Sequence, residues 1–308
     1  MFLLIKFTLL YAVVLMLVAM GGMFSERSGV INIALEGIMA IGGLAGVFVL
    51  VLFPDLPAPA LVALSILASA VSGMIYSLLL GFSAITLKAD QTIGGTALNM
   101  LATAIAIVLV KAFNNGSDVG NGAASAKLNY TNAAFIYKIG PFTVNIFLFI
   151  GIILLICSYV FLFKTKWGLR LRACGEHPHA ADAAGINVFK VRYAAVMISG
   201  ALAGLGGATI LVTYSGEFSG SVAGMGFLAL AALIFGQWKP LGVLGATFFF
   251  GFAATLANAS QAEPALQAIP EVILKVFPYV VTLLALIFFS KSTQAPRAAG
   301  EPFEKGKR

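Results

Sequence analysis

Long apolar runs, separated by short polar segments, make up most of the chain. A run of about 20 predominantly apolar residues is long enough to cross a bilayer as an α-helix. On this pattern we expect nine membrane-spanning helices, at residues 3–24, 30–53, 58–80, 92–113, 142–163, 191–213, 224–237, 240–258 and 271–290. The seventh run is short for a bilayer, so the expected number lies between eight and ten.

Three segments of this pattern carry further expectations. No small-residue cleavage site follows the first run, so we expect a retained helix rather than a signal peptide. The second run is glycine-rich, with Gly37, Gly42, Gly43 and Gly46, and is a candidate for the broken helices found in transporters. Residues 114–141 are rich in Asn, Gly and Ser, which predicts a flexible exterior loop.

The composition supports a membrane protein. Of the 308 residues, 60% are hydrophobic and 10% are charged, and the mean hydropathy is +0.99. Because a soluble domain cannot bury that much apolar surface, we expect an all-α, polytopic fold. The 33 glycines suit close packing of helices in lipid. We attribute the net charge of +7 to cytoplasmic loops and not to nucleic-acid binding.

The distribution of Lys and Arg predicts the orientation. Basic residues gather in the segment 164–192 and after Ser290, so both are expected on the cytoplasmic side. The segments 53–59, 214–224 and 259–270 contain no Lys or Arg and are expected outside. This arrangement fits nine spans with the N-terminus outside. It divides the chain into a transmembrane domain at 1–290, with a cytoplasmic loop at 164–192, and a basic cytoplasmic tail at 291–308.

One polar segment, GEHPHAADAAGINVFK at 175–190, stands between two apolar runs. Pro178 suits the first turn of a helix, four alanines are strong helix formers, and Gly185 suits a left-handed cap. We therefore predict a helix of about two turns at 178–184. Such a helix is too short to be stable alone in water, so the membrane domain or a partner must hold it.

The residues themselves leave three interpretations of this helix open. It is a solvated connector, or it docks in a groove of a cytoplasmic protein, or Cys174, His177 and His179 form part of a metal site. The metal-site interpretation lacks a fourth ligand. If the helix docks, an Arg at Ala181 or Ala184 should block docking and leave the membrane spans intact.

Several motifs of other function classes are missing from the sequence. There is no G-x-x-x-x-G-K-[ST] loop to bind ATP in the usual way, and no H-E-x-x-H metal motif. Charged residues inside the expected spans are sparse, whereas ion-coupled carriers and pumps depend on buried ionisable groups. No charged ring or polar filter of a channel is visible. A secondary transporter is therefore the less favoured class.

Three separated motifs resemble one family. The stretches GVINIALEGIMAIGG (29–43), LRACGEHPHAADAAGI (171–186) and GMGFLALAALIFGQWKPLGVLGATFFFG (224–251) are similar to the permeases of bacterial ABC importers for simple sugars, branched-chain amino acids and nucleosides. The likeness is strongest to the shorter permease of nucleoside importers. It implies a type II ABC importer-like fold in the bacterial cytoplasmic membrane, and import of nucleosides, with sugars or branched-chain amino acids as the alternative.

The resemblance also implies partners and roles. A separate ABC ATPase would bind ATP, a second, paralogous permease would complete the pathway, and an extracytoplasmic lipoprotein would deliver substrate. This chain would be non-catalytic and carry no cofactor of its own. The polar helix would be the coupling helix, formed by Glu176, His177, Pro178, His179, Ala180, Ala181, Asp182, Ala183, Ala184 and Gly185.

Four residues are candidates for the substrate path, and each has a structural alternative. Glu36 lies in an apolar run, where it lines the path or else holds backbone N–H groups. The amides of Asn99 and Asn32 bind a ribose or base, or else join helices. Phe227 stacks on a base, or else anchors a helix end at the membrane interface.

The predicted orientation has a direct test. Single cysteines placed near Gly185 and at Ala299, in a background without Cys157 and Cys174, should be labelled by an impermeant maleimide only after the membrane is opened. Labelling of either position from outside intact cells would contradict the orientation.

Overall fold

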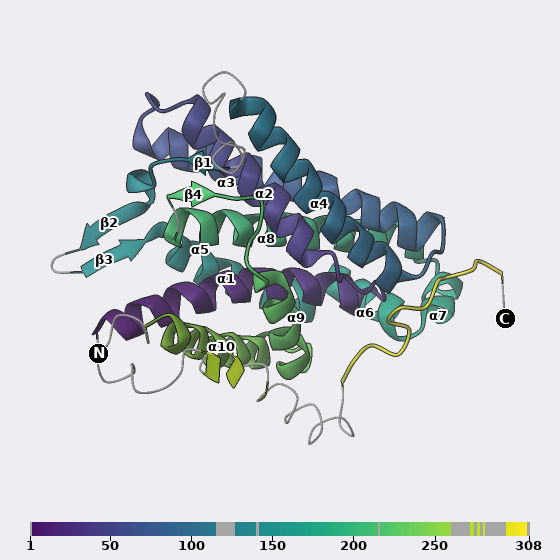
Figure 1. The fold of residues 1–308 in the computed structure, drawn as a ribbon. Coiled ribbons are helices and arrows are strands. Elements are labelled where there is room, and N and C mark those ends of the chain that lie inside the picture. Colours follow the sequence, from purple (N-terminus) through teal and green to yellow (C-terminus); the bar gives the residue numbers. More distant parts are fainter. Residues whose placement is uncertain are drawn as a thin grey trace.

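The computed structural model describes residues 2–114, 127–139, 142–214, 216–259 and 294–306, together with a few isolated positions between 272 and 280. These residues form a bundle of long helices with short strands at one end (Figure 1). The helices are α1 (Phe2–Arg27), α2 (Leu35–Leu52), α3 (Ala58–Gly81), α4 (Gln91–Asn114), α5 (Ile146–Lys164), α6 (Lys166–Glu176), α7 (Pro178–Ala183), α8 (Val188–Tyr214), α9 (Met225–Phe235) and α10 (Pro240–Ala259).

The described helices confirm the expected polytopic fold. Six of them are long and apolar enough to cross a membrane, and two shorter apolar helices, α9 and α10, coincide with the seventh and eighth expected spans. The 11 residues of α9 reach only about 17 Å at about 1.5 Å per residue, well short of a bilayer core. The ninth expected span, 271–290, lies outside the described residues except for isolated helical positions.

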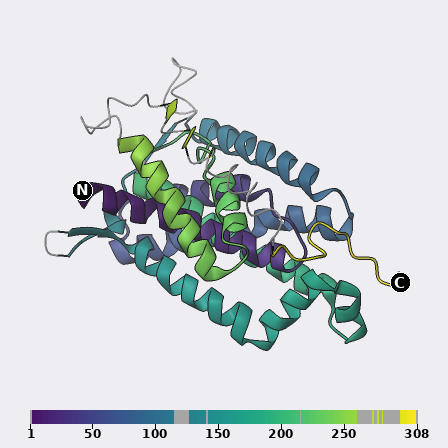
Figure 2. The same cartoon turned by 90° about the horizontal axis from the view of Figure 1, so that it is seen from below.

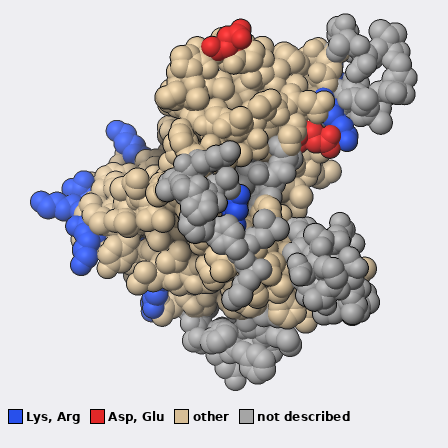
Figure 3. Space-filling model, turned by 90° about the vertical axis from the view of Figure 1, so that its left-hand side faces the viewer, with Lys and Arg blue, Asp and Glu red and all other residues tan. Residues whose placement is uncertain are grey.

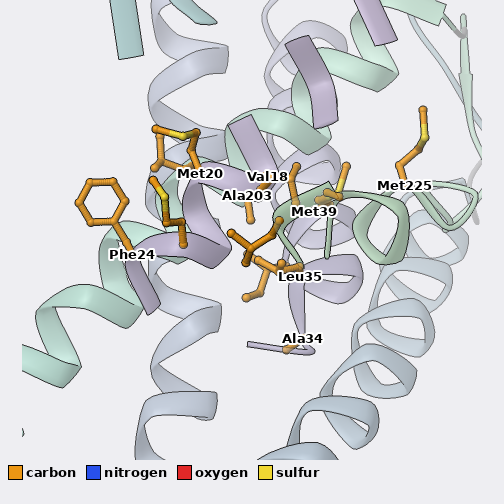
Figure 4. Packing of buried hydrophobic residues seen from close by; sticks show 14 of the residues in the cluster. Val18, Met20, Phe24, Ala34, Leu35, Met39, Ala203 and Met225 are labelled. Atoms are coloured by element: carbon orange, nitrogen blue, oxygen red, sulfur yellow. The ribbon is translucent and has the colours of Figure 1, made fainter. Parts of the chain in front are cut away.

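The helices α1 and α8 form the centre of the bundle. Over the most apolar 18 residues of each helix, 67% of α1 and 72% of α8 is buried inside the protein. The same share is 22% for α4 and for α5. Side chains of α1, α2 and α8 meet there, among them Val18, Met39 and Ala203, with Met225 of α9 beside them (Figure 4). The exposed apolar faces of α4 and α5 are suited to lipid or to a partner chain.

Small residues allow α2, α3 and α8 to approach closely. A Cβ added at Gly204 of α8 would lie 2.2 Å from the Ser69 carbonyl oxygen of α3, and one added at Gly42 of α2 would lie 2.3 Å from the Gly204 Cα. Likewise, a Cβ at Gly73 of α3 would meet the Gly200 oxygen at 2.3 Å. The small-residue spacing of Gly200 and Gly204 therefore serves helix packing.

The second expected span is irregular, but not where its glycines lie. Residues 37–46 belong to one continuous helix, so the candidate break at these glycines is wrong: they serve close packing instead. The irregular backbone precedes the helix, at residues 28–34, which we call the α1–α2 connector. Val30, Asn32 and Ala34 of this connector are fully buried.

Short strands occupy the end of the bundle that carries the N-terminus. In the part of the predicted exterior loop that the structure describes, β1 (Leu128–Asn129) pairs with β4 (Glu217–Phe218), and β2 (Ile136–Ile139) forms a hairpin with β3 (Phe142–Asn145). The ion pair between Lys127 Nζ and Glu217 Oε1, at 3.0 Å, lies beside the first pair of strands. The sequence pattern did not predict these strands, and residues 115–126 lie outside the described residues.

The two ends of the bundle differ. The N-terminus and the β2–β3 hairpin lie at one end, and α7 and the C-terminal residues lie at the other (Figures 1 and 2). The described surface of the N-terminal end is mostly uncharged, with basic side chains gathered along one edge (Figure 3). This separation agrees with the predicted placement of the N-terminus and of the segment 164–192 on opposite sides of the membrane.

Candidate functional site

The short helix α7 has the ends that the sequence predicts. Pro178 occupies its first turn, where a missing N–H costs nothing. Gly185 has a φ of +81°; its N–H donates to the Asp182 oxygen at 2.9 Å, and the Ile186 N–H donates to the Ala181 oxygen at 3.0 Å. This pair of hydrogen bonds is the Schellman motif, which fixes the exit of the chain from the helix.

The side chains of α7 divide between two faces. Pro178 and Ala181 are buried against the rest of the protein, Glu176 and Asp182 are half-buried, and the remaining predicted coupling residues, His177, His179, Ala180, Ala183, Ala184 and Gly185, are exposed. The exposed alanines form a small, uncharged surface that projects from the bundle. Only 4% of Ala181 is exposed, so we expect Arg at this position to disturb the packing of α7 against the protein as well as docking, whereas Ala184 is exposed.

The helix α6 joins α7 to the centre of the bundle, and the sequence pattern did not predict it. The backbone of Gly175 lies against α1: a Cβ there would be 2.3 Å from the Arg27 oxygen. Glu176 Oε1 lies 3.8 Å from Arg27 Nη1. The end of α6 therefore lies in direct contact with the end of α1.

The residues proposed as a partial metal site do not converge. Cys174 is fully buried, while His177 and His179 are exposed. Burial raises the pKa of the Cys174 thiol to about 11, so the thiolate that would bind a metal is disfavoured at neutral pH. Among the described residues there is no group of three His, Cys, Asp or Glu side chains that could hold a metal ion.

Three of the four substrate-path candidates meet at one cavity of about 320 Å³ between α2, α4 and α9. Its lining consists of Glu36, Thr96, Asn99, Met100, Thr103 and Phe227. Phe227 is 47% exposed and Met100 is 77% exposed, so the cavity opens on the surface of this chain. Its volume is at the lower end of the range of about 300–1,000 Å³ for small-molecule sites.

The carboxylate of Glu36 holds the start of α9. Its Oε1 accepts from the Gly224 N–H at 2.8 Å, and its Oε2 accepts from the Gly226 N–H at 2.6 Å. Gly226 must be small, because a Cβ there would lie 2.5 Å from the Glu36 Cα. A carboxylate at a helix N-terminus binds unpaired N–H groups and suits the helix dipole. This geometry matches the structural interpretation of Glu36.

The two asparagines bind the protein itself. Asn99 Oδ1 accepts from the Gly37 N–H at 2.7 Å, and Asn99 Nδ2 donates to the Ile33 oxygen at 2.9 Å. Asn32 is fully buried and donates from Nδ2 to Ser199 Oγ at 2.8 Å. Asn32 does not line the cavity, so the structure separates it from the other three candidates.

The contacts of Trp238 and the burial of Arg192 were not predicted from the sequence. Trp238, in the turn between α9 and α10, donates from Nε1 to Glu26 Oε2 at 2.6 Å, and its carbonyl accepts from Arg27 Nη2 at 2.9 Å. Arg192 of α8 is only 1% exposed. Arg192 could have been found from the sequence, because a charged residue at the start of a predicted span is unusual. The pairing of Glu26 with Trp238 could not, because the two residues are 212 positions apart in the chain.

A bundle with six helices long and apolar enough to cross a membrane is the architecture of a multi-pass membrane protein. A family described as branched-chain amino acid transport system / permease component matches residues 4–286. The chain belongs to this family and is a multi-pass membrane protein.

Curated relatives match nearly the full chain. The guanosine ABC transporter permease protein NupQ of Bacillus subtilis is 43% identical over 306 residues, which cover 98% of this chain and 96% of that protein. The nucleoside ABC transporter permease protein NupC of Lactococcus lactis is 37% identical, with 97% and 96% covered. A second guanosine permease of Bacillus subtilis, NupP, is 26% identical, with 74% and 66% covered. No solved structure matches the chain.

The anchoring of α9 by Glu36 can be tested by stability. Replacing Glu36 with Ala removes two charge-assisted hydrogen bonds and leaves two buried N–H groups, which should lower the free energy of unfolding by about 3 kcal/mol. Glu36→Gln keeps one acceptor oxygen and should lose less. Thermal unfolding of the purified protein in detergent measures both variants; an unchanged midpoint for Glu36→Ala would contradict the anchoring role.

Proposed function

We propose that this chain is the membrane-spanning permease subunit of an ATP-driven ABC importer for nucleosides in the bacterial cytoplasmic membrane. The observation that carries the proposal is α7, a capped helix that projects small side chains from the end of the bundle opposite the N-terminus. The two relatives that match nearly the full chain, named as permeases for guanosine and for nucleosides, support the substrate class.

In this proposal the energy comes from another polypeptide. The chain has no phosphate-binding loop of the usual kind, so ATP is bound and hydrolysed by an ABC ATPase, and this subunit is non-catalytic and without a cofactor. The exposed alanines of α7 enter a groove on the ATPase, and closure of the ATPase moves α6 and α7. The contacts of Gly175 and Glu176 with Arg27 pass that movement to α1.

The open cavity supports a pathway shared with a second permease. Among the described residues, α2, α4 and α9 line the cavity on one side and leave the other side open, which suits a second chain as the other wall. A paralogous permease is the partner we propose, since Bacillus subtilis has two guanosine permease proteins that both match this chain. An extracytoplasmic lipoprotein delivers the solute to the end of the bundle that carries the N-terminus.

The lining of the cavity favours a neutral solute with an aromatic ring. Thr96 and Thr103 offer hydroxyl groups, and the exposed ring of Phe227 offers a stacking surface. Base–aromatic stacking contributes about 1–3 kcal/mol. The carboxylate of Glu36 is occupied by the backbone of α9, so a nucleoside fits this lining better than a cationic solute.

Uptake measurements test this function. A strain lacking this chain should lose uptake of radiolabelled guanosine, and the chain supplied on a plasmid should restore it. Uptake should stop on ATP depletion and survive ionophores that collapse ion gradients, which separates an ABC importer from a secondary transporter. Intact guanosine uptake, with loss of ribose or leucine uptake instead, would replace nucleosides by sugars or branched-chain amino acids.

Docking of α7 predicts a specific effect at Ala184. This side chain is exposed, so Ala184→Arg should leave the permease folded but place an unpaired charge in the ATPase groove. Such a buried charge costs about 3–5 kcal/mol, so association with the ATPase should weaken by about 100-fold or more. Co-purification and ATPase stimulation measure the effect.

Two other variants complete that experiment. Ala184→Ser adds one small polar group and should retain association. Ala181→Arg should instead lower the amount of folded permease, because Ala181 is buried. Full association and full transport by Ala184→Arg would mean that α7 is only a connector.

A further inference from the structure

The last described residues, 294–306, are not a detached tail. They run across the end of the bundle that carries α7 (yellow in Figure 1), and we call them the C-terminal strap. The Ala298 N–H donates to the Gly175 oxygen at 2.9 Å, and the Gly300 N–H donates to the Gly29 oxygen at 3.1 Å. The strap therefore binds both α6 and the α1–α2 connector through its backbone.

A buried arginine lies beneath the strap. Arg192 Nε donates to the Ser28 oxygen at 3.1 Å, and Arg192 Nη1 donates to the Glu301 oxygen at 2.9 Å. Because Arg192 is only 1% exposed, each lost hydrogen bond would leave a buried charge without compensation. The strap thus supplies one of the hydrogen-bond acceptors for the buried guanidinium group that α8 places beside the connector.

The strap also contacts α7 directly. The ring of Phe303, which is 4% exposed, lies 5.1 Å from the ring of His179 in α7 and 5.4 Å from the ring of Phe189 in α8. These separations are typical of favourable aromatic pairs. Beside them, Lys88 Nζ lies 3.2 Å from Glu304 Oε1, which ties the same part of the strap to the turn between α3 and α4.

These contacts give α7 a support that its own length cannot provide. Isolated helices shorter than about 12 residues are marginal in water, and α7 has six residues, of which only Pro178 and Ala181 are buried. Phe303 fills the space between α7 and the start of α8, so the strap determines how rigidly the two helices move together.

We propose that the C-terminal strap positions α7 against α8 and the α1–α2 connector, so that movement of α7 reaches the membrane helices, with Phe303 as its positioning residue. The proposal rests on the proposed function, since it assigns the strap a role in coupling to an ATPase. It predicts that loss of Phe303 uncouples ATP hydrolysis from transport and leaves ATPase binding in place.

The test uses the complete transporter in proteoliposomes and measures solute transported per ATP hydrolysed. Phe303→Ala should lower this ratio by about fivefold or more, the lower end of typical coupling between sites, while the ATPase still co-purifies. Phe303→Tyr keeps the ring and should restore the ratio. Lys305→Ala, an exposed position of the strap, is the matched control and should not change it.

Two outcomes of that test would overturn the proposal. One is an unchanged ratio for Phe303→Ala. The other is a ratio that falls only in proportion to the loss of assembled complex, which would assign the strap to stability alone. If Phe303→Ala prevents assembly, the ratio is measured with Phe303→Leu instead, and it should lie below the ratio of Phe303→Tyr.

A second measurement is independent of the solute. Cysteines at His179 and Phe303, in a background without Cys157 and Cys174, should be joined by a bifunctional maleimide whose spacer replaces the two contacting rings. Absence of the cross-link would overturn the proposal. The transport ratio is measured with whichever solute the unmodified complex imports, so a solute other than a nucleoside would refute that part of the proposed function and leave the strap test valid.

Discussion

The need to pair every buried backbone polar group governs the centre of this protein. The α1–α2 connector, residues 28–34, is irregular and buried, and no water in a bilayer core can satisfy such a backbone. Other elements bind several of its backbone groups instead: the Ile31 N–H donates to Gln91 Oε1 at 2.7 Å, and Asn99 Nδ2 of α4 donates to the Ile33 oxygen. The carbonyl oxygens of Ser28 and Gly29 are bound by Arg192 and by the C-terminal strap.

This requirement explains why the asparagine and arginine side chains point inward. In a bilayer, helices gain little from hydrophobic association, and close packing and internal hydrogen bonds hold them together. Both the oxygen and the nitrogen of the Asn99 amide form hydrogen bonds with the backbone of residues 33 and 37. Close approach of α2 to α8 through Gly42 and Gly204 then fixes the helix that follows the connector, so hydrogen bonds hold the connector and close packing holds α2.

The sequence predicted what depends on local patterns. The spans follow from runs of apolar residues, and the helix α7 follows from Pro178, its alanines and Gly185, which occupy the predicted cap positions. The pairing of β1 with β4 lacks such a signal because it joins segments far apart in the chain, whereas the local hairpin of β2 and β3 and the helix α6 were missed. The burial of Ala181 was also missed, since a six-residue helix is too short for periodicity to show which face lies against the protein.

The candidate site was predictable only as a set of unusual residues. Glu36, Asn99 and Phe227 stand out as polar or aromatic groups near span ends, but only the fold shows that they line one cavity. Their partners lie far along the chain: Glu36 binds Gly224 across 188 residues and Asn99 binds Gly37 across 62. No spacing rule of helices or strands links such positions.

The α1–α2 connector also links the two candidate sites. At one end, Arg192, Gly29 and the strap join it to α6 and α7, where the ATPase is proposed to bind. At the other end, Asn99 and Glu36 join it to α4 and to the start of α9, which bound the cavity. These contacts form a continuous chain of packed and hydrogen-bonded residues from α7 to the lining of the cavity, which is the kind of physical network that carries coupling between distant sites. The coupling proposed above therefore has a structural route through the connector.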